Sequence, residues 1–484
     1  MDILILTEGG KNYGLGHVAR CSSIYQAFEY FNHSPKFIVN GDYSIKSIIP
    51  DIDFEIIDWN NDFFSIPQAD IVVVDSYLVD LDFFYKISEK VSLVIYLDDN
   101  NRLNYPKGIV VNGTLDVSNI KYSKRENIKY LVGNEYIPLR KEFWNINKLK
   151  INDSIKNILI IMGGNDLRNL TPRILKLLID NFPNANKKVI IGDSFKNVHE
   201  IKSLKNDKVD LIYSPDSNGV IDAMSSVDLA ISASGQTLYE LACIGVPTVS
   251  IGIIDNQKNN ISNWINQGFI EYAGCWNDDN LLTNILNRIE YLQDKNIRHD
   301  KKLFGIQAVD GKGALKIVKS ILNAFYKDNS IFRTIRKEDC LKIFEIANDD
   351  EVRIFSFNSN KIPLENHKKW FENILNDNSV KFYVLEYENE LIGQLRFDFD
   401  EEYPVISISL NKKYRGLNLS KYLLYKGLEE VSDFDKVIAY IKKDNERSIS
   451  FFKSMGFVFE NEVIIHDIKA MKFYYKGGNS EKNY

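Results

Sequence analysis

The stretch that decides the fold lies near the start of the chain and reads Thr7-Glu8-Gly9-Gly10-Lys11-Asn12-Tyr13-Gly14-Leu15-Gly16-His17-Val18-Ala19-Arg20. The five residues before it, Asp2-Ile3-Leu4-Ile5-Leu6, form a short apolar run that is typical of a buried parallel strand. After it, apolar side chains repeat at helical spacing, at Val18, Cys21, Ile24 and Phe28. The stretch is therefore predicted to join a strand to a helix at the carboxyl edge of a sheet, where open α/β folds bind ligands.

His17 is predicted to lie in or near the first turn of that helix, where the helix dipole disfavours imidazolium. A neutral imidazole beside a backbone that binds anions suits a general base for water. Gly14 and Gly16 would let the backbone approach a ligand closely. The alternative is that His17 is a polar cap and the glycines form an ordinary tight turn, because a short glycine motif alone is only a hypothesis.

Bulk properties restrict the possible functions. A chain of 484 residues is long enough for about three domains. A net charge of -6 provides no basic surface for nucleic acid. The four cysteines are scattered and lack the spacing of a metal or disulfide site. The sequence shows neither a secretory signal nor an apolar run of membrane-spanning length, so we expect a cytoplasmic protein without a membrane partner. The oligomeric state stays open.

Residues 1–150 alternate short β-rich runs with helical stretches, which predicts a doubly wound parallel sheet. Polar residues follow several of the candidate strands, namely Asp75-Ser76-Tyr77, Asp98-Asp99 and Asn112-Gly113. These are carboxyl-end positions, like the glycine-rich stretch. Asp98 and Asp99 either face a ligand or only cap a turn. The candidate strands are residues 36–39, 53–57, 71–74, 93–97 and 109–111.

A second doubly wound α/β unit is predicted over residues 151–328. It begins with a strand over residues 157–162 and the turn Gly163-Gly164-Asn165-Asp166, and we expect Thr171 to cap the next helix with Pro172 at its first position. Residues 232–237 form a small, hydroxyl-rich loop before a helix, which is how a phosphate site is built. A nucleotide on this unit would face His17, as in nucleotide-sugar enzymes of the GT-B type.

Residues 1 to about 325 resemble the UDP-sugar hydrolases of pseudaminic acid biosynthesis, which remove UDP from 2,4-diacetamido-2,4,6-trideoxy-β-L-altropyranose. The resemblance implies that His17 is the base that activates water, that Glu240 helps to hold the nucleotide and that Asn256 orients it or the sugar. The family often carries arginine and aspartate where this chain has Leu6 and Glu8. The matching segments are Gly14–His17, Val74–Tyr77, Leu97–Asp99, Met162–Asp166, Ser232–Ser234 with Glu240, and Asn256-Gln257.

The chemistry follows from this assignment. Because UDP is a good leaving group, the reaction needs mainly a pocket for the pyrophosphate, a water on the opposite sugar face and a base, and it would invert the anomeric carbon. Backbone amides near residues 232–237 would stabilise the charge that develops on UDP. We expect no metal, the pair Asp98-Asp99 being the nearest candidate. The predicted substrate-binding residues are Gly14, Gly16, Tyr77, Gly163, Gly164, Asn165, Asp166, Ser232, Ser234, Glu240, Asn256 and Gln257.

Residues 329–476 follow a mixed α/β pattern, with strands predicted over 331–335, 380–387, 391–398, 405–410 and 436–441. Two motifs stand out, Arg415-Gly416-Leu417-Asn418-Leu419-Ser420 before a helix and Asn445-Glu446-Arg447-Ser448 with Gly456-Phe457 downstream. This order resembles the GNAT acyl-CoA-dependent N-acyltransferases. The resemblance implies acetyl-CoA as co-substrate, with its pyrophosphate on amides at a helix N-terminus. The predicted CoA-binding residues are Arg415, Gly416, Asn418, Ser420, Asn445 and Ser448.

This third domain departs from the GNAT pattern at several positions. Asn418 and Ser420 replace small residues, and Phe452 replaces the tyrosine proposed to protonate the CoA thiolate. His367, which resembles a histidine of the pathway's 4-amino-sugar N-acetyltransferase, and Trp370 lie on a candidate helix where acceptors bind. Possible bases are Glu386, Asp398 and Asp400. Residues 477–484 form a polar tail that we expect to be disordered.

The favoured interpretation is a bifunctional enzyme that acetylates the 4-amino group of a UDP-linked sugar and then hydrolyses off UDP. Fusion of the two activities would raise the effective concentration of the intermediate. Three alternatives stay open. The first is a GT-B glycosyltransferase, the second a GNAT domain with another acyl group or acceptor, and the third a GNAT domain without catalysis.

Overall fold

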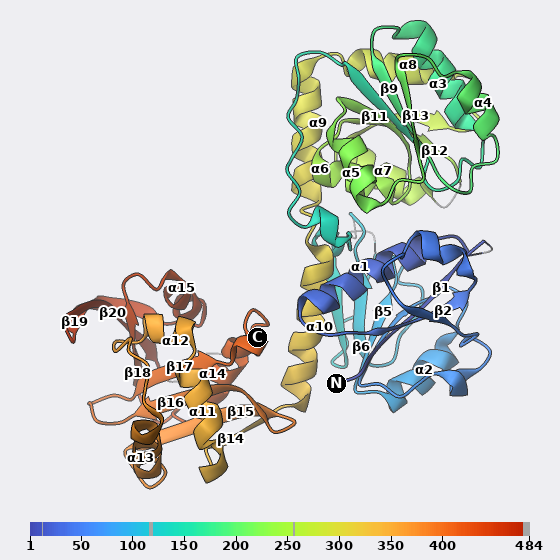
Figure 1. Ribbon diagram of the computed structural model, residues 1–484. Helices are drawn as coiled ribbons and strands as arrows, with labels where there is room; N and C mark the ends of the chain where they lie inside the picture. Colours follow the sequence, from blue (N-terminus) through green and yellow to red (C-terminus); the bar gives the residue numbers. More distant parts are fainter. Residues whose placement is uncertain (12, 116–119, 255–256, 478–484) are drawn as a thin grey trace. The chain divides into compact units, whose positions relative to one another are not determined.

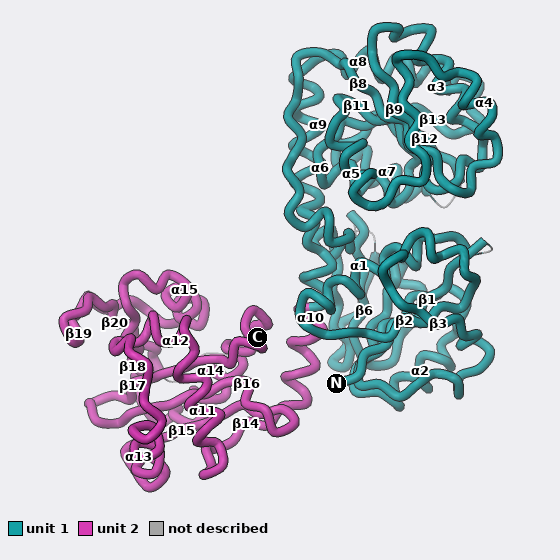
Figure 2. Tube along the Cα trace, in the orientation of Figure 1, with its two compact units in different colours: residues 1–318 teal, residues 319–484 magenta. Residues whose placement is uncertain are grey.

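The computed structural model describes residues 1–11, 13–115, 120–254 and 257–477. The chain divides into two compact units, residues 1–318 and 319–484 (Figure 2). Asn256 and residues 478–484 of the predicted tail lie outside the described residues. Within the described part of the chain, no helix has both the length and the apolar character needed to cross a membrane.

The first unit begins with a seven-stranded parallel sheet in the order β3-β2-β1-β4-β5-β6-β7. The five strands predicted after the first are all confirmed, each within two residues at either end, and β7 was not predicted. The helices of this part are α1 (Gly16–Tyr30) and α2 (Leu81–Lys90). The strands are β1 (Ile3–Gly9), β2 (Lys36–Gly41), β3 (Phe54–Ile56), β4 (Ile71–Asp75), β5 (Leu93–Leu97), β6 (Gly108–Asn112) and β7 (Ile128–Val132).

The strand order places the glycine-rich stretch at a switch point. All seven residues of β1 are buried because the strand lies between β2 and β4 with both faces covered, which explains its nearly continuous apolar sequence. The chain leaves β1 towards β2 and leaves β4 towards β5, so the right-handed connections put α1 and α2 on opposite sides of the sheet (Figure 1). The loops after β1 and β4 therefore border a crevice at the carboxyl edge.

A second parallel sheet follows in the order β10-β9-β8-β11-β12-β13. Two hydrophobic clusters cover its faces, and alternate residues of β8 belong to each. In Figure 1, α3, α4 and α8 lie on one side of this sheet and α5, α6 and α7 on the other. The strands are β8 (Asn157–Ile161), β9 (Asn186–Ile191), β10 (Val209–Tyr213), β11 (Leu229–Ala233), β12 (Thr248–Gly252) and β13 (Ile270–Cys275). The helices are α3 (Leu170–Asn181), α4 (Val198–Ser203), α5 (Ser217–Ser225), α6 (Thr237–Ile244), α7 (Lys258–Asn266), α8 (Leu281–Tyr291), α9 (Lys295–Ala308) and α10 (Gly313–Asn329).

Two local predictions in this sheet are wrong. The first helical residue of α3 is Leu170, so Thr171 is not its cap and Pro172 is not its first residue. The Asp166 carboxylate caps the helix instead, accepting the backbone N–H groups of Leu170 at 2.9 Å and Thr171 at 2.7 Å. Ser232 lies inside β11 and not in the loop that follows it, because the strand continues to Ala233.

The second unit contains a seven-stranded sheet in the order β14-β15-β16-β17-β18-β20-β19. Its neighbours are antiparallel except β17 and β18, which are parallel and pair only at Val405 and Ile438, so they separate beyond that point. The predicted strands are confirmed, whereas β19 and β20 were not predicted. The strands are β14 (Ile331–Thr334), β15 (Val380–Tyr387), β16 (Glu390–Asp398), β17 (Val405–Leu410), β18 (Lys436–Lys442), β19 (Val458–Ile465) and β20 (Ile468–Lys476). The helices are α11 (Cys340–Ala347), α12 (Asp350–Phe355), α13 (Leu364–Ile374), α14 (Leu419–Glu429) and α15 (Glu446–Ser454).

Candidate functional site

His17 lies in the first turn of α1, as predicted, and its ring contacts a buried carboxylate. Nδ1 of His17 is 2.7 Å from Oδ1 of Asp75, the last residue of β4. Asp75 is fully buried. Because the carboxylate can only accept, Nδ1 carries the proton and donates it, which leaves Nε2 as the basic nitrogen of the ring. The pair has the geometry of a base and the residue that orients it.

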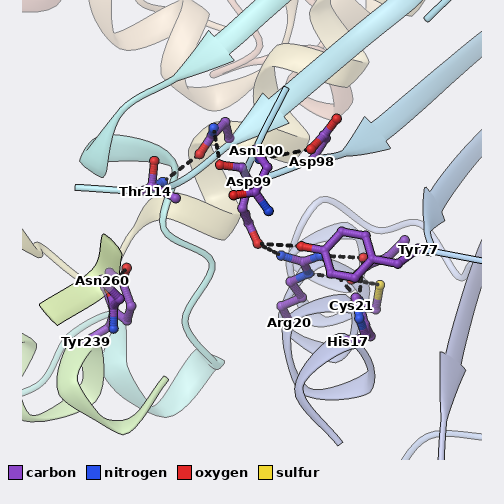
Figure 3. A network of polar contacts seen from close by, with 12 residues as sticks. His17, Arg20, Cys21, Tyr77, Asp98, Asp99, Asn100, Thr114, Tyr239 and Asn260 are labelled. Atoms are coloured by element: carbon purple, nitrogen blue, oxygen red, sulfur yellow. Dashed lines mark hydrogen bonds and ion pairs between the residues drawn. The ribbon is translucent and has the colours of Figure 1, made fainter. Parts of the chain in front are cut away.

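Arg20 holds this pair in its ionised state. It lies one turn after His17 on α1, donates two hydrogen bonds to Asp75, and donates a third to Asp99 (Figure 3). Burial by itself would raise the pKa of Asp75, but the charge and hydrogen bonds of Arg20, with the hydrogen bond of His17, lower it to about 2. Burial would lower the pKa of Arg20, but Asp75 and Asp99 raise it well above its ordinary value.

Tyr77 lies over the histidine. The two rings meet edge to face with their centroids 4.9 Å apart, and the Tyr77 hydroxyl is 3.4 Å from Oδ2 of Asp99 (Figure 3). The Glu8 carboxylate accepts the backbone N–H of Tyr77 and so fixes this loop to β1. Glu8 thus has a positioning contact, while Leu6, the other departure from the related hydrolases, is buried in the core.

Asp98 and Asp99 have different environments. Asp98 is buried and accepts the backbone N–H groups of Asn100 and Arg102 and the hydroxyl of Tyr105. It therefore caps a turn, which was one of its two predicted roles, whereas Asp99 faces Arg20. Within the described residues, no group of His, Cys, Asp and Glu side chains is arranged to hold a metal ion.

The glycines of the first loop leave open space beside the backbone. Gly10 and Gly14 exchange two backbone hydrogen bonds, and Gly14 has a φ of 81° that favours glycine. A Cβ added at Gly14 or Gly16 would meet no heavy atom within 4 Å. Gly163 and Gly164 are equally open, and Gly163 has a φ of 80°. Both pairs of glycines can therefore admit a ligand against the backbone.

The serines predicted to bind phosphate at the end of β11 already make hydrogen bonds within the protein. The hydroxyls of Ser232 and Ser234 are buried, and they bond to the Ala233 carbonyl oxygen at 3.0 Å and to Ser250 Oγ at 3.2 Å, respectively. They therefore do not offer these groups to a phosphate. Asn260, which sequence reasoning missed, donates to the Ser234 carbonyl oxygen at 2.9 Å and joins α7 to this loop.

Four further predicted residues border the second sheet. Glu240, in the first turn of α6, accepts a hydrogen bond from Arg140 at 2.8 Å. Gln257 Oε1 accepts the Ile253 N–H at 2.9 Å, and its amide nitrogen is close to Gly235. Asn165 is exposed in the turn, and Asp166 is the cap of α3 described above. Asn256 lies outside the described residues.

Four contributors to this site were missed from the sequence: Asn260, already described, and Asp75, Arg20 and Arg140. The sequence places Asp75 after a strand and in a segment that carries the resemblance, but it does not identify this carboxylate as the partner of His17. Arg20 follows His17 by three residues, a spacing that puts both on one helix face. Arg140 is 100 residues from Glu240, and no local signal could have paired them.

The second unit contains a cavity of about 1280 Å³ that follows the gap between β17 and β18. It brings together four predicted CoA-binding residues, Arg415, Ser420, Asn445 and Ser448, but Gly416 and Asn418 do not line it. At Gly416 a φ of 82° and open space beside the backbone still permit close approach of a ligand. The cavity is larger than most single-ligand sites and has room for two substrates.

Two of these predicted CoA-binding residues already have partners in the protein. Arg415 donates to Asp349 Oδ1 at 2.6 Å, to Glu351 Oε2 at 3.1 Å and to the Leu410 carbonyl oxygen. Asn445 caps α15 by accepting the Ser448 N–H at 3.0 Å. A phosphate would therefore compete with two carboxylates for Arg415.

The remaining predicted residues divide into those in the cavity and one outside it. His367, Trp370, Asp398, Asp400 and Phe452 line the cavity. Glu386 does not, and it is ion-paired with Arg333 at 2.5 Å. His367 is buried and its Nε2 lies 2.9 Å from the Cys340 carbonyl oxygen, and burial lowers the pKa of its ring although that hydrogen bond opposes the shift.

Residues 342–457 match the model of the acetyltransferase (GNAT) family. The second unit therefore contains a GNAT domain. The match supports acetyl-CoA as the co-substrate and confirms the predicted fold of this part of the chain. A spermidine N-acetyltransferase of Vibrio cholerae, solved with CoA and spermine, covers 31% of this chain and 96% of its own at 14% identity, with a TM-score of 0.29.

Three curated proteins are similar over longer stretches. An uncharacterized protein of Methanocaldococcus jannaschii is 26% identical, and the match covers 94% of this chain and 96% of that protein. The pseudaminic acid cytidylyltransferase and UDP-2,4-diacetamido-2,4,6-trideoxy-beta-L-altropyranose hydrolase of Helicobacter pylori is 27% identical over 53% of this chain, and the chain spans 45% of it. The spore coat polysaccharide biosynthesis protein SpsG of Bacillus subtilis is 21% identical over 68% of this chain and 99% of its own length.

Proposed function

We propose that the first unit hydrolyses a UDP-linked 2,4-diacetamido-2,4,6-trideoxy sugar, with β-L-altropyranose as the expected configuration, to the free sugar and UDP. The contact between His17 and Asp75 is the observation that carries this proposal. The similarity to the hydrolase of Helicobacter pylori supports the choice of substrate. The functional domains would be residues 1–150, 151–328 and 329–476.

In this reaction a water oxygen bonds to the anomeric carbon as the bond from that carbon to the UDP oxygen breaks, and the electron pair leaves with UDP. The water proton passes to Nε2 of His17. Asp75 holds the ring in the tautomer that leaves Nε2 free and stabilises the imidazolium that forms. Because water attacks the face opposite UDP, the configuration inverts.

The second sheet would hold UDP. Gly163 and Gly164 leave the backbone open to a phosphate, and α6 begins directly after the loop that carries Gly235. Glu240 is held by Arg140, so its second carboxylate oxygen could accept a hydrogen bond from a ribose hydroxyl. Since the Ser232 and Ser234 hydroxyls point into the fold, main-chain groups would make the phosphate contacts there.

The GNAT domain would acetylate the 4-amino group of the precursor sugar before hydrolysis. Its cavity joins four of the six predicted CoA-binding residues to His367, Trp370 and Asp398, which would surround the acceptor. Phe452 has no proton to give to the CoA thiolate, so water or another group would supply it. A GNAT domain without catalysis is the second candidate, favoured by the two carboxylates that already bind Arg415, the residue predicted to contact the CoA pyrophosphate.

The test is a mass-spectrometric time course on the UDP-linked 4-amino sugar, with and without acetyl-CoA, using the full chain and His17→Ala. We expect free diacetamido sugar from the wild type only when acetyl-CoA is present. His17→Ala should stop at the acetylated UDP-sugar. If UDP does not leave even the acetylated substrate unless a sugar acceptor is added, a glycosyltransferase replaces the hydrolase.

A further inference from the structure

A separate cavity of about 390 Å³ lies at the carboxyl edge of the first sheet. Its walls come from the glycine-rich loop, the end of β2, the segment after β3 and the loop between β4 and α2. Neither His17 nor Asp75 lines it, but Tyr13 precedes His17 by four residues and Leu78 follows Tyr77 directly. The lining residues are Tyr13, Asn40, Asp58, Asn60, Asn61, Leu78, Val79, Asp80 and Phe83.

The charge of this cavity excludes a phosphate ligand. Its described lining contains two carboxylates, Asp58 and Asp80, and neither lysine, arginine nor histidine. Two negative charges repel a diphosphate, and the polar groups that remain are three carboxamides and one phenol. The lining therefore suits an uncharged ligand that makes many hydrogen bonds, or one that carries an amine.

The polar groups combine with an apolar floor. Val79 and Phe83 are buried below the cavity, while Leu78 and Tyr13 are exposed at its edge. A sugar ring that carries acetamido groups offers N–H donors, carbonyl acceptors and methyl groups together. Carboxamide side chains donate and accept at once, so they match both polar ends of an acetamido group, and the apolar floor matches its methyl group.

One of the carboxamides, that of Asn60, has unused bonding capacity. The oxygen of Asn60 is buried and has no hydrogen-bond partner among the described residues, a state that costs free energy until a donor arrives. Asn40 lies near the end of β2 on the cavity wall. In contrast, the carboxylates already have partners in the protein. Asp80 caps α2 by accepting a hydrogen bond from the Phe83 N–H at 3.0 Å, and Asp58 accepts one from the Asn61 side chain. These hydrogen bonds hold the cavity wall in place.

We propose that this cavity binds the acetamido-bearing sugar ring, while the diphosphate lies outside it. A volume of about 390 Å³ is at the lower end of small-molecule sites and fits one substituted ring better than a whole nucleotide sugar. The assignment rests on the proposed hydrolase function, because it places the sugar of that substrate beside the loops that carry His17 and Tyr77.

The experiment measures binding of the free diacetamido sugar to the full chain by saturation-transfer NMR, together with the steady-state kinetics of UDP release. Asn40→Ala and Asn60→Ala each remove one carboxamide from the wall. Asn104→Ala is the matched control, since Asn104 is exposed in the same sheet domain and does not line the cavity. Thermal melts establish that each variant is folded.

Each cavity variant should weaken binding of the free sugar about 3- to 10-fold and raise KM for the UDP-sugar by a similar factor, with UDP affinity unchanged. A sugar with hydroxyls in place of its acetamido groups should bind less tightly to the wild type. Unchanged sugar binding and KM in both folded variants would overturn the proposal. If the wild type never releases UDP but the variants still lose sugar binding, the hydrolase proposal fails and the cavity assignment stands.

Discussion

Replacing Asp75 by asparagine tests whether His17 is a base that this carboxylate orients. The substituted side chain keeps the shape of aspartate but presents an N–H group where Oδ1 accepted the His17 proton. A donor at that place favours the imidazole with its proton on Nε2, which cannot take a proton from water. We expect kcat for UDP release to fall about 10²- to 10⁴-fold, with KM little changed.

The same substitution has a stability cost that follows from the pKa of Asp75. Lowering that pKa from 3.8 to about 2 corresponds to about 2 kcal/mol of folding free energy. Because the folded-state pKa lies below the unfolded one, this contribution is complete above about pH 4 and is lost as the pH falls towards 2. Arg20 would keep only Asp99 as an ion-pair partner, so we expect a total loss of about 2–4 kcal/mol at pH 7.

The assay compares UDP release by wild type, Asp75→Asn and Asp99→Asn at a temperature well below each unfolding midpoint. Asp99→Asn is the control, because it removes a charge from Arg20 and leaves the contact between His17 and Asp75 intact. We expect it to lose less than tenfold in kcat. If folded Asp75→Asn keeps its activity within threefold of wild type, Asp75 does not orient the base. Equal losses in both variants would assign the effect to Arg20.

Four other substitutions test the charged pairs and the GNAT domain. Glu351→Gln should tighten CoA binding two- to fivefold by calorimetry, because it removes one of two carboxylates that compete for Arg415, and looser binding would contradict this. Phe452→Tyr should raise kcat for acetyl transfer, and an unchanged kcat would show that protonation of the thiolate is not slow. Arg140→Ala should lower the free energy of unfolding by about 1–3 kcal/mol in chemical denaturation because it leaves Glu240 without its partner. Glu240→Gln, which keeps a hydrogen bond, should cost less, and a larger loss in that variant would refute the pairing.

The strands that were predicted from the sequence include those that are buried along their length, because such a strand consists mainly of consecutive apolar residues. The strands β4 and β5 are buried at every position, so β5 and the first four residues of β4 appear as uninterrupted apolar runs. The edge strand β7 is only half buried and contains Lys129, and β19 is exposed along most of its length. Loops also contain such partly exposed or exposed residues, so the sequences of β7 and β19 do not distinguish an edge strand from a loop. Neither strand was predicted for this reason.

In the site, the features set by neighbouring residues were predicted, whereas contacts between residues distant in the sequence were not. The place of His17 at the start of α1 depends on neighbouring residues, and it was predicted. The partner of its Nδ1 is 58 residues away, and Arg415 meets Asp349 across 66 residues. Sequence motifs identify the residues at a sheet edge, but they do not show which of these residues already form hydrogen bonds with other parts of the protein. Ser232 and Ser234 were assigned to a phosphate for this reason, although the fold uses their hydroxyls.

The charges around His17 explain why two carboxylates and one arginine accompany a single base. A lone Asp75 would be protonated more easily on burial, and Arg20 prevents this by holding it ionised. With His17 neutral, the group formed by His17, Arg20, Asp75 and Asp99 carries one net negative charge, and it becomes neutral when His17 accepts a proton. The site is therefore better matched to the imidazolium that forms during the reaction than to the resting imidazole. Interactions that strengthen in the transition state raise kcat without lowering KM, so Asp99, which supplies the extra negative charge, should affect kcat alone.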